Sequence, residues 1–516
     1  MMIWSTEVSR IFRENAGRTF LIDAIDGGAT SYGDLAGRAA SLARQLESRG
    51  LRSGDRIGIQ LPNGSLFATL YFACLLGGFT AVPVNNALPA KDRIFVLGRS
   101  RLSAIVVEAG SEGFTDVSSD GISGCPVLTI SNGQADADLS PGVANDGDVD
   151  GRFAAIENDR LFSIHFTSGT TSLPKGVAHR VSALLDNARS FNRTFGLGRD
   201  NRFVHVMPMP YMAGFLNTLL GAFTAEACIV LAPQFGPQSS LRFWEPVAAH
   251  GGDAIWVSPT MLATLTRVDR GSTGLELCGN GRMRIFSATA PLTHKIQREF
   301  EDKYRVRVIE SYGLSELLLI TANDGPAGSK VASVGTILPD VRIEIRDSDG
   351  HAVEAGRDGA IVVNTPHATA GYIDFETGLP IAVQDPWFDT GDVGHIDVDG
   401  YLFVTGRVKD LIIRGGFNIS PRQIEETLLR HPAVQDVAVV GAPHDFFGEQ
   451  IVAAVIPVAG HRVEEIQASL RESCLSSLGK TSVPDRFVAF EAFPMTNLGK
   501  VQKNRIRDIV SGAAGA

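Results

Sequence analysis

A segment rich in serine, threonine and glycine is the part of the sequence best suited to binding an anion. It consists of Thr167, Ser168, Gly169, Thr170, Thr171, Ser172, Leu173, Pro174, Lys175 and Gly176, and it follows an apolar β-type run over residues 161–166. Glycines let backbone N–H groups turn toward an anion, hydroxyl groups donate further hydrogen bonds, and a lysine adds a positive charge. The segment therefore predicts a phosphate-binding loop. Its spacing differs from GxxxxGK followed by Ser or Thr, which argues against a P-loop NTPase.

Four further motifs follow this loop along the chain. They are Tyr312-Gly313-Leu314-Ser315-Glu316, Thr390-Gly391-Asp392, Gly406-Arg407-Val408-Lys409-Asp410 and Gly499-Lys500. Taken singly, Tyr312 is typical of a core residue, Asp392 of a turn residue and Arg407 of a surface ion-pair partner. Their order behind the phosphate-binding loop favours one shared site instead.

In that order the five motifs resemble those of the adenylate-forming superfamily, which contains acyl-CoA synthetases, the adenylation domains of peptide synthetases and firefly luciferases. The resemblance extends from about residue 31 to residue 507. It implies an α/β fold with a large multi-sheet N-terminal domain, residues 1–406, and a small mobile α+β C-terminal domain, residues 407–516. It also implies an acid–thiol ligase that converts a carboxylic acid and ATP to acyl-AMP and pyrophosphate, and then forms a thioester with coenzyme A.

The resemblance gives the nucleotide-binding residues individual roles. The loop residues Thr167, Ser168, Gly169, Thr170, Thr171 and Lys175 would bind the β- and γ-phosphates of ATP. Glu316 would be catalytic by helping to hold Mg²⁺, a hard cation that takes carboxylate and phosphate oxygens together. Tyr312 would offer its ring to adenine, with Gly313 and Ser315 in the same turn. Asp392 would accept both ribose hydroxyls, and Arg407 would reach ribose or phosphate.

The C-terminal segment carries the main catalytic candidate. Lys500 resembles the superfamily's lysine that bridges carboxylate and α-phosphate oxygens during adenylation, where a mobile ammonium can neutralise developing charge. Lys409 matches the hinge position about which the C-terminal domain rotates between the two half-reactions. Gly415-Gly416 matches the backbone that lines the pantetheine tunnel of CoA ligases. A hairpin turn is the alternative interpretation of the two glycines.

The candidate acid-binding residues are apolar or aromatic, and they depart from the superfamily's pattern in places. They are Tyr211, Phe215, Trp256, Val257, Ala288 and Leu314. Ala288-Thr289 replaces a Gly-Gly pair, which puts the pocket size in doubt, and Tyr211 stands at an aromatic-or-His position. His179 is out of register with the superfamily's histidine, which aligns with Val181, and receives no role.

An aspartate that would pair with a substrate ammonium is missing near Tyr211, because Met212, Ala213 and Phe215 are neutral. This predicts a carboxylic acid that is not an amino acid, with fatty, branched, cyclic and aryl acids all open and fatty acid metabolism as one setting. The rival prediction is an acyl-AMP ligase that transfers its acyl group to a separate acyl carrier protein or stops at acyl-AMP.

The composition excludes several other classes of protein. With 57 acidic and 47 basic residues the net charge is −10, so nucleic acid is not an expected partner. The five cysteines are scattered without a CxxC pair, which predicts reduced thiols. With no recognisable signal sequence, this favours a cytoplasmic protein. The most apolar window, residues 67–84, is interrupted by Gly and Pro and predicts a buried helix followed by a strand, not a membrane span. Monomer and homodimer remain open.

Alternating helix and strand patterns must position these residues. Helices are expected over residues 32–49 and 65–76, and strands over 56–60, 81–84, 104–107, 161–166, 202–206, 228–231, 254–257, 283–286 and 306–310. Such alternation predicts parallel strands covered by helices. Residues 108–160 are expected to form a loose surface excursion. After residue 406 we expect a short αβ unit over 421–458 and then a polar, basic tail.

Overall fold

The computed structural model describes residues 2–25, 27–110, 125–132, 137–142, 146–167, 174–324, 328–495 and 501–512. Five predicted site residues lie outside this part of the chain: Ser168, Gly169, Thr170, Thr171 and Lys500.

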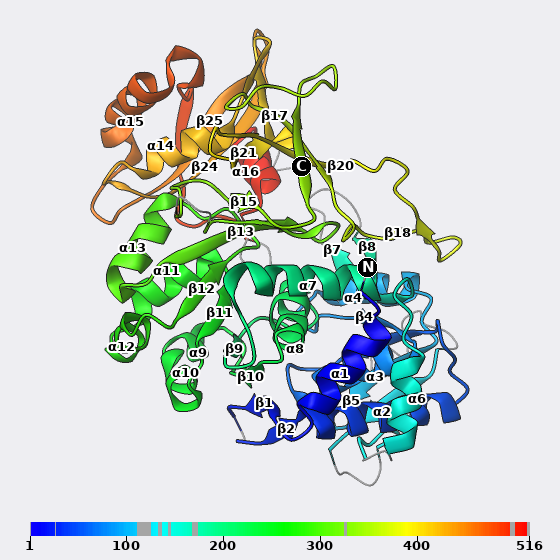
Figure 1. Cartoon of the computed structure of the whole chain (residues 1–516). Coiled ribbons are helices and arrows are strands. Elements are labelled where there is room, and N and C mark those ends of the chain that lie inside the picture. Colours follow the sequence, from blue (N-terminus) through cyan, green and yellow to red (C-terminus); the bar gives the residue numbers. More distant parts are fainter. Residues whose placement is uncertain are drawn as a thin grey trace.

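Three β-sheets organise the described residues (Figure 1). The largest has thirteen strands in the order β16 (Arg342–Arg346), β17 (Gly359–Asn364), β20 (Phe388–Ile396), β21 (Tyr401–Arg407), β15 (Gly335–Ile337), β14 (Leu318–Ala322), β13 (Val308–Leu314), β12 (Arg284–Ser287), β11 (Ala254–Val257), β9 (Arg202–His205), β10 (Cys228–Leu231), β1 (Thr19–Asp23) and β2 (Ala29–Ser31). The second has eight, in the order β19 (Pro380–Ile381), β18 (Gly371–Ile373), β8 (Lys175–Arg180), β7 (Leu161–Thr167), β4 (Thr80–Pro83), β3 (Arg56–Gln60), β5 (Ala104–Glu108) and β6 (Val127–Ile130). The third has five: β23 (Phe417–Ile419), β22 (Ile412–Arg414), β25 (Gly448–Pro457) and β24 (Val434–His444) in that order, with β26 (Arg486–Ala489) on β25.

The predicted strands and the first two predicted helices are confirmed to within a few residues. The helices are α2 (Tyr32–Ser48), which starts with a capping box between Ser31 and Asp34, and α3 (Ser65–Gly77). Strands β3, β4, β5 and β6 pair in parallel, as the alternation predicts. The apolar window is α3 followed by β4, with α3 buried over most of its length. No helix in the described part of the chain has both the length and the apolar character needed to cross a membrane.

Helices connect the strands and cover the sheets. Within the described residues, the other helices before residue 400 are α1 (Trp4–Glu14), α4 (Ala90–Arg99), α6 (Asp146–Ala154), α7 (Val181–Phe195), the π-helix η1 (Ala213–Leu220), α8 (Gly221–Thr224), α9 (Pro237–Ser240), α10 (Trp244–His250), α11 (Pro259–Val268), α12 (Thr273–Gly279) and α13 (His294–Tyr304). Helix α7 packs against β8 of the eight-stranded sheet, β14 of the thirteen-stranded sheet and η1, so it joins the two sheets.

The expectation of a loose excursion over residues 108–160 is wrong in part. Strand β6 extends the eight-stranded sheet, and α6 packs against α1 and α2. Ile130, Leu139 and Phe153 are buried, and Arg152 pairs with Glu47 through two hydrogen bonds. A few apolar side chains therefore anchor a segment whose average composition is polar.

The expected polar tail is likewise more ordered than predicted. After β25 come α15 (Val463–Leu478), the 3₁₀ turn η3 (Lys480–Ser482), β26 and α16 (Lys503–Val510). Leu470, Cys474 and Ile506 are fully buried, because both helices are amphipathic and lay one side on the third sheet. The αβ unit itself is confirmed as α14 (Pro421–Leu429), β24 and β25.

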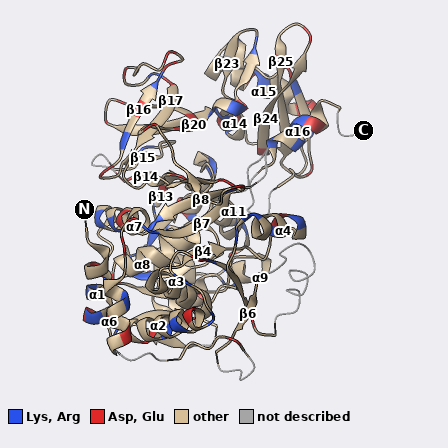
Figure 2. Ribbon diagram, turned by 90° about the vertical axis from the view of Figure 1, so that its right-hand side faces the viewer, with Lys and Arg blue, Asp and Glu red and all other residues tan. Residues whose placement is uncertain are grey.

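The chain leaves the thirteen-stranded sheet after Arg407 and enters the five-stranded sheet at Ile412, with the 3₁₀ turn η2 (Val408–Asp410) between them. The five-stranded sheet and α14 to α16 form a smaller body at one end of the molecule (Figure 2). The predicted α/β class, a large multi-sheet region with a small C-terminal unit, is thereby confirmed. The boundary at residue 406 stays a prediction.

Candidate active site

The predicted phosphate-binding segment joins two neighbouring antiparallel strands. Strands β7 and β8 pair directly, with Thr167 opposite Lys175 as the last pair before residues 168–173. The flanking residues of the predicted loop are thus held together by the eight-stranded sheet, and Lys175 is exposed.

Two predicted nucleotide-binding residues, Tyr312 and Arg407, bind the buried carboxylate of a third, Asp392. Up to 95 positions separate these three residues in the sequence. The Tyr312 hydroxyl donates to Oδ2 of Asp392 at 2.6 Å, and Nε of Arg407 donates to Oδ1 at 2.8 Å. Asp392 and Arg407 are register partners on β20 and β21, while Tyr312 comes from β13. Burial, reinforced by the Asp392 charge, raises the pKa of Tyr312 far above its usual range, so its hydroxyl remains a donor.

Backbone constraints explain the glycine and the turn of the Tyr312 motif. A Cβ on Gly313 would lie 2.1 Å from the Leu318 carbonyl oxygen, where β13 and β14 approach each other across a register shift. No larger residue fits without moving the hairpin. The Ser315 carbonyl meets Nε2 of His179 at 2.6 Å, and Leu314 is half-buried against the core. A hydrogen bond from His179 of β8 thereby holds the backbone of the motif in place.

Glu316 and Lys175 approach the same tyrosine from different sheets. The Tyr372 hydroxyl, on β18, donates to Oε1 of Glu316 at 2.8 Å. The ammonium nitrogen of Lys175 lies 4.9 Å from the centre of the Tyr372 ring. The Thr369 N–H donates to the Glu316 carbonyl at 2.7 Å. The predicted metal ligand and the predicted phosphate-binding lysine are therefore neighbours where the two large sheets meet.

The acid-binding candidates lie around η1 and the ends of two parallel strands. Tyr211 is half-buried just before η1, and Phe215 within it is fully buried, stacked on Tyr71 at 4.2 Å between centroids and on His165 at 5.2 Å. A Cβ on Gly214 would lie 2.3 Å from the Pro208 carbonyl oxygen, so η1 depends on this close approach. Such π-helical turns occur frequently at functional sites.

Trp256, Val257 and Ala288 complete the candidate set. Trp256 on β11 is fully buried and stacks on Phe286 at 4.9 Å. Val257 ends β11, and its carbonyl accepts from the Ala288 N–H just beyond β12. Phe215, Trp256 and Ala288 belong to one apolar cluster, whereas Val257 and Tyr211 belong to a second. Their roles toward an acid remain predictions.

The remaining candidates lie at the junction with the C-terminal unit. Gly415 and Gly416, with φ of 57° and 84°, form the two-residue turn between β22 and β23, where Arg414 pairs with Phe417. The alternative interpretation as a hairpin turn is therefore confirmed, because a turn of this type needs φ above zero at both positions. A role along a pantetheine path stays a prediction. Lys409 lies in η2, immediately after Arg407.

Sequence reasoning missed three residues that hold this site together. His179 is fully buried, and burial lowers its pKa to about 4, so its ring is neutral and binds the Ser315 carbonyl. The Tyr372 hydroxyl, on β18, binds the Glu316 carboxylate, and the N–H of Thr369, just before β18, binds the Glu316 carbonyl. These contacts link residues that are 53 to 136 positions apart in the chain, so a local sequence pattern does not indicate them.

Glu310 is a buried carboxyl between the candidate site and α14. It is 4% exposed, it accepts the Leu292 N–H at 3.2 Å, and burial raises its pKa to about 7. Arg422 on α14 opposes this shift and Glu426 reinforces it. A raised pKa in the folded state means that the native protein keeps a proton that the unfolded chain loses, so this residue lowers stability as pH rises from about 4.5 to about 7.

We therefore expect Glu310→Gln to stabilise the protein much more at pH 8 than at pH 5. The full effect above pH 7 is at most about 3.5 kcal/mol, because the pKa rises from 4.5 to about 7 and one pKa unit is worth about 1.4 kcal/mol. Melting temperatures of both proteins at the two pH values test this. Glu376→Gln, at an exposed position, is the matched control. An equal change at both pH values would contradict the assignment.

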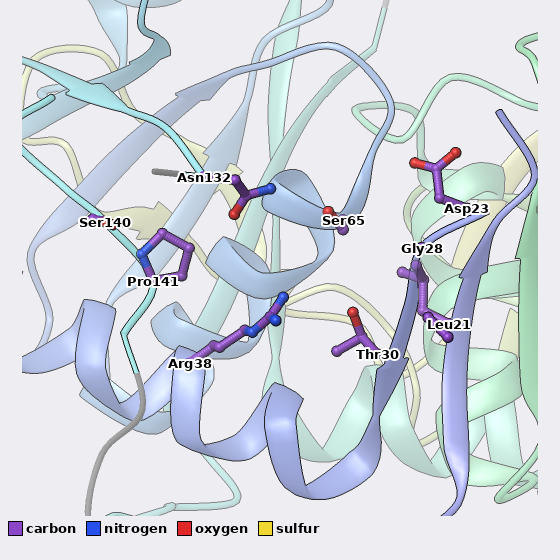
Figure 3. Close-up of a pocket in the computed structure, with 10 residues that line it drawn as sticks. Leu21, Asp23, Gly28, Thr30, Arg38, Ser65, Asn132, Ser140 and Pro141 are labelled. Atoms are coloured by element: carbon purple, nitrogen blue, oxygen red, sulfur yellow. The ribbon is translucent and has the colours of Figure 1, made fainter. Parts of the chain in front are cut away.

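A separate cavity lies in the N-terminal region (Figure 3). It measures about 450 Å³, and its lining includes Arg38 of α2, Ser65 at the start of α3, Thr30 and Asn132. None of its lining residues is a predicted site residue, so it plays no part in the site described above.

Comparisons with known proteins agree with these motifs. Residues 8–373 match the sequence model for the AMP-binding enzyme family, and residues 423–500 match that for the AMP-binding enzyme C-terminal domain. The sulfoacetate–CoA ligase of Cupriavidus necator is 31% identical over 503 residues, which cover 95% of this chain and 94% of that protein. The oxalate–CoA ligase of Arabidopsis thaliana is 30% identical over 478 residues, 91% of each chain.

A solved structure extends the similarity to the whole fold. ATP-bound MatB from Rhodopseudomonas palustris matches with a TM-score of 0.82 and 26% identity, covering 99% of this chain and 100% of that one. The chain belongs to the AMP-binding enzyme family, the adenylate-forming superfamily that its five motifs resemble.

Proposed function

We propose that the protein is an ATP-dependent acid–thiol ligase that activates a carboxylic acid lacking an amino group. It forms acyl-AMP with release of pyrophosphate, and coenzyme A then displaces AMP to give the acyl-CoA thioester. The observation that carries the proposal is the meeting of Tyr312, Asp392 and Arg407 at one buried carboxylate. The sequence-wide match to a family of AMP-binding enzymes supports it.

The side chains suit an attack of one anion on another. A carboxylate must approach the α-phosphate while pyrophosphate departs, so negative charge has to be screened on both sides. Lys175, the first residue of β8, supplies a cation, and Arg407 supplies a second one beside Asp392, the ribose-binding candidate. We propose that Lys500 adds a third at the reacting oxygens.

Magnesium fits this arrangement. Glu316 offers carboxylate oxygens next to Lys175, and Mg²⁺ binds through one or two carboxylates together with substrate phosphates. Bound there, the ion would neutralise phosphate charge. The role of the chain is to hold the Glu316 carboxylate in place, which the Tyr372 and Thr369 hydrogen bonds do.

Coenzyme A is the acceptor favoured over a carrier protein. The relatives named above are CoA ligases for sulfoacetate and for oxalate, and a 28% identical relative from Mycobacterium tuberculosis is named a long-chain fatty acid–CoA ligase. Their names agree with the predicted reaction class. They also span small polar acids and long apolar ones, so the acid itself is to be found by experiment.

Mass spectrometry of products tests the proposal directly. The enzyme is incubated with ATP, Mg²⁺ and separate acids, namely sulfoacetate, oxalate, a fatty acid, a cyclic acid and an aryl acid, with and without coenzyme A. We expect acyl-AMP with one acid class and its conversion to acyl-CoA when coenzyme A is added. Acyl-AMP that persists in the presence of coenzyme A would contradict coenzyme A as the acceptor. If none of the acids gave acyl-AMP, the proposal of an acid–thiol ligase would be wrong.

Lys409 gives a test of the two-step reaction. We expect Lys409→Pro to slow coenzyme A-dependent AMP release about 10- to 100-fold and to leave acyl-AMP formation within about threefold, because proline fixes φ where the chain must rotate. Single-turnover assays measure the two steps separately. Lys409→Ala is the control, since it removes the side chain but leaves the backbone free to rotate. Equal loss of both steps would count against a hinge at this position.

A further inference from the structure

Tyr372 stands between the two oppositely charged residues of the proposed phosphate and metal site. Its hydroxyl donates to Oε1 of Glu316 at 2.8 Å, while the Lys175 ammonium lies 4.9 Å from the centre of its ring. The hydroxyl end of the side chain thus meets the anion, and the negatively polarised ring face meets the cation. Within the described residues, Lys175 and Glu316 form no ion pair with each other.

The backbone around Tyr372 is fixed on both sides. Gly371 and Tyr372 pair with Ala178 and Val177 of β8, and Tyr372 and Ile373 pair with Ile381 and Pro380 of β19. Gly371 has φ of 134°, and a Cβ there would lie 2.1 Å from the Ile381 carbonyl oxygen. The backbone position of Tyr372 is therefore set by two strand pairings.

The Glu316 turn is attached to the same strands. The Thr369 hydroxyl donates to the Ala178 carbonyl at 2.6 Å, and the Thr369 N–H donates to the Glu316 carbonyl at 2.7 Å. The His179 ring meets the Ser315 carbonyl at 2.6 Å. The backbone of the turn and the carboxylate thus have separate supports, so removal of the Tyr372 hydroxyl alone leaves the turn attached.

The separation matters for the chemistry. Lysine and glutamate side chains that close into an ion pair satisfy each other, and each is then less available to an outside ligand. A phosphate needs the lysine charge, and a magnesium ion needs the carboxylate oxygens.

We propose that Tyr372 is a positioning residue that keeps Lys175 and Glu316 apart, leaving the lysine to the phosphates and the carboxylate to the metal ion. The inference rests on the proposed function, because it takes ATP and Mg²⁺ as the ligands of this site. It assigns two separable tasks to one side chain. The hydroxyl orients Glu316, and the ring holds Lys175.

Nucleotide binding separates these two tasks. ATP affinity is measured by calorimetry in EDTA and across a Mg²⁺ titration, without any acid substrate. We expect Tyr372→Phe to leave ATP affinity in EDTA within about twofold, since the ring remains. It should raise the Mg²⁺ concentration needed for half-maximal strengthening of ATP binding about tenfold, the effect of one hydrogen bond to a charged group. Tyr372→Leu, which loses the ring as well, should also weaken ATP binding in EDTA about tenfold.

Tyr401→Phe is a closely matched control. The Tyr401 hydroxyl donates to the Gly328 carbonyl at 2.7 Å, and Lys330 lies 4.6 Å from its ring centre, yet no predicted site residue contacts either group in these interactions. We expect it to change neither measurement. An unchanged Mg²⁺ requirement in Tyr372→Phe would overturn the proposal, as would an equal loss of ATP affinity with and without Mg²⁺. Failure of the wild-type protein to bind ATP would instead overturn the proposed function.

Discussion

Replacing Lys500 with alanine should slow acid-dependent pyrophosphate release about 100- to 1,000-fold. The resemblance implies that this ammonium neutralises the negative charge that develops on the carboxylate and α-phosphate oxygens. In other enzymes, removal of one group that stabilises such charge lowers the rate by a factor of this size. Because the interaction belongs to the transition state, the dissociation constant for ATP should stay within a few-fold of the wild-type value. A pyrophosphate-release assay with a saturating acid measures the rate, and calorimetry measures the affinity.

Lys503→Ala is the control for this experiment. Lys503 lies only three positions further along, but it forms an ion pair with Glu425 at 2.6 Å within the C-terminal unit. We expect its replacement to change pyrophosphate release less than threefold, because ion pairs near a surface contribute little. If both variants lost activity alike, the loss would come from the whole basic segment, and Lys500 would have no special role.

The fold class and nine of the 21 described strands of the two large sheets could be predicted because their signal is local. Short β-branched and apolar runs such as residues 228–231 and 254–257 coincide with β10 and β11. Segments in which only a few residues are apolar were not predicted as helices or strands. Strand β6 and helices α6 and α15 carry only a few core side chains each, so their average composition looks like that of a loop or tail.

The site was predictable as a set of residues but not as a set of contacts. Ordered motifs gave Tyr312, Asp392 and Arg407 separate roles, which stay predictions, and Tyr312 lies within the residues that match the AMP-binding enzyme family. That the Tyr312 hydroxyl and Arg407 both donate to Asp392 depends on the pairing of β20 with β21 and on the placement of β13. Tyr372 was not predicted, because the role that we propose for it depends on a contact between β18 and the distant turn of Glu316.

Asp392→Asn should weaken ATP binding about 10- to 100-fold. Both carboxylate oxygens accept hydrogen bonds from protein donors, one from Tyr312 and one from Arg407. An asparagine keeps one acceptor and sets an NH₂ donor against the other partner, which removes a hydrogen bond to a charged group. Arg407 is half-exposed, so water can solvate it in the variant and the fold should persist. Asp389→Asn, at an exposed position earlier on the same strand, is the control and should have less than a twofold effect.

Nucleotide analogues decide whether Asp392 reads the ribose or only fixes Tyr312 and Arg407. A carboxylate has about four lone-pair sites, so two remain for ribose hydroxyls after both protein donors are bound. If Asp392 accepts them, wild-type protein should prefer ATP to 2′,3′-dideoxy-ATP by at least about tenfold, and Asp392→Asn should lose most of that preference. If the variant weakened both nucleotides equally, the carboxylate would act only by holding Tyr312 and Arg407, and the assignment to ribose would be wrong.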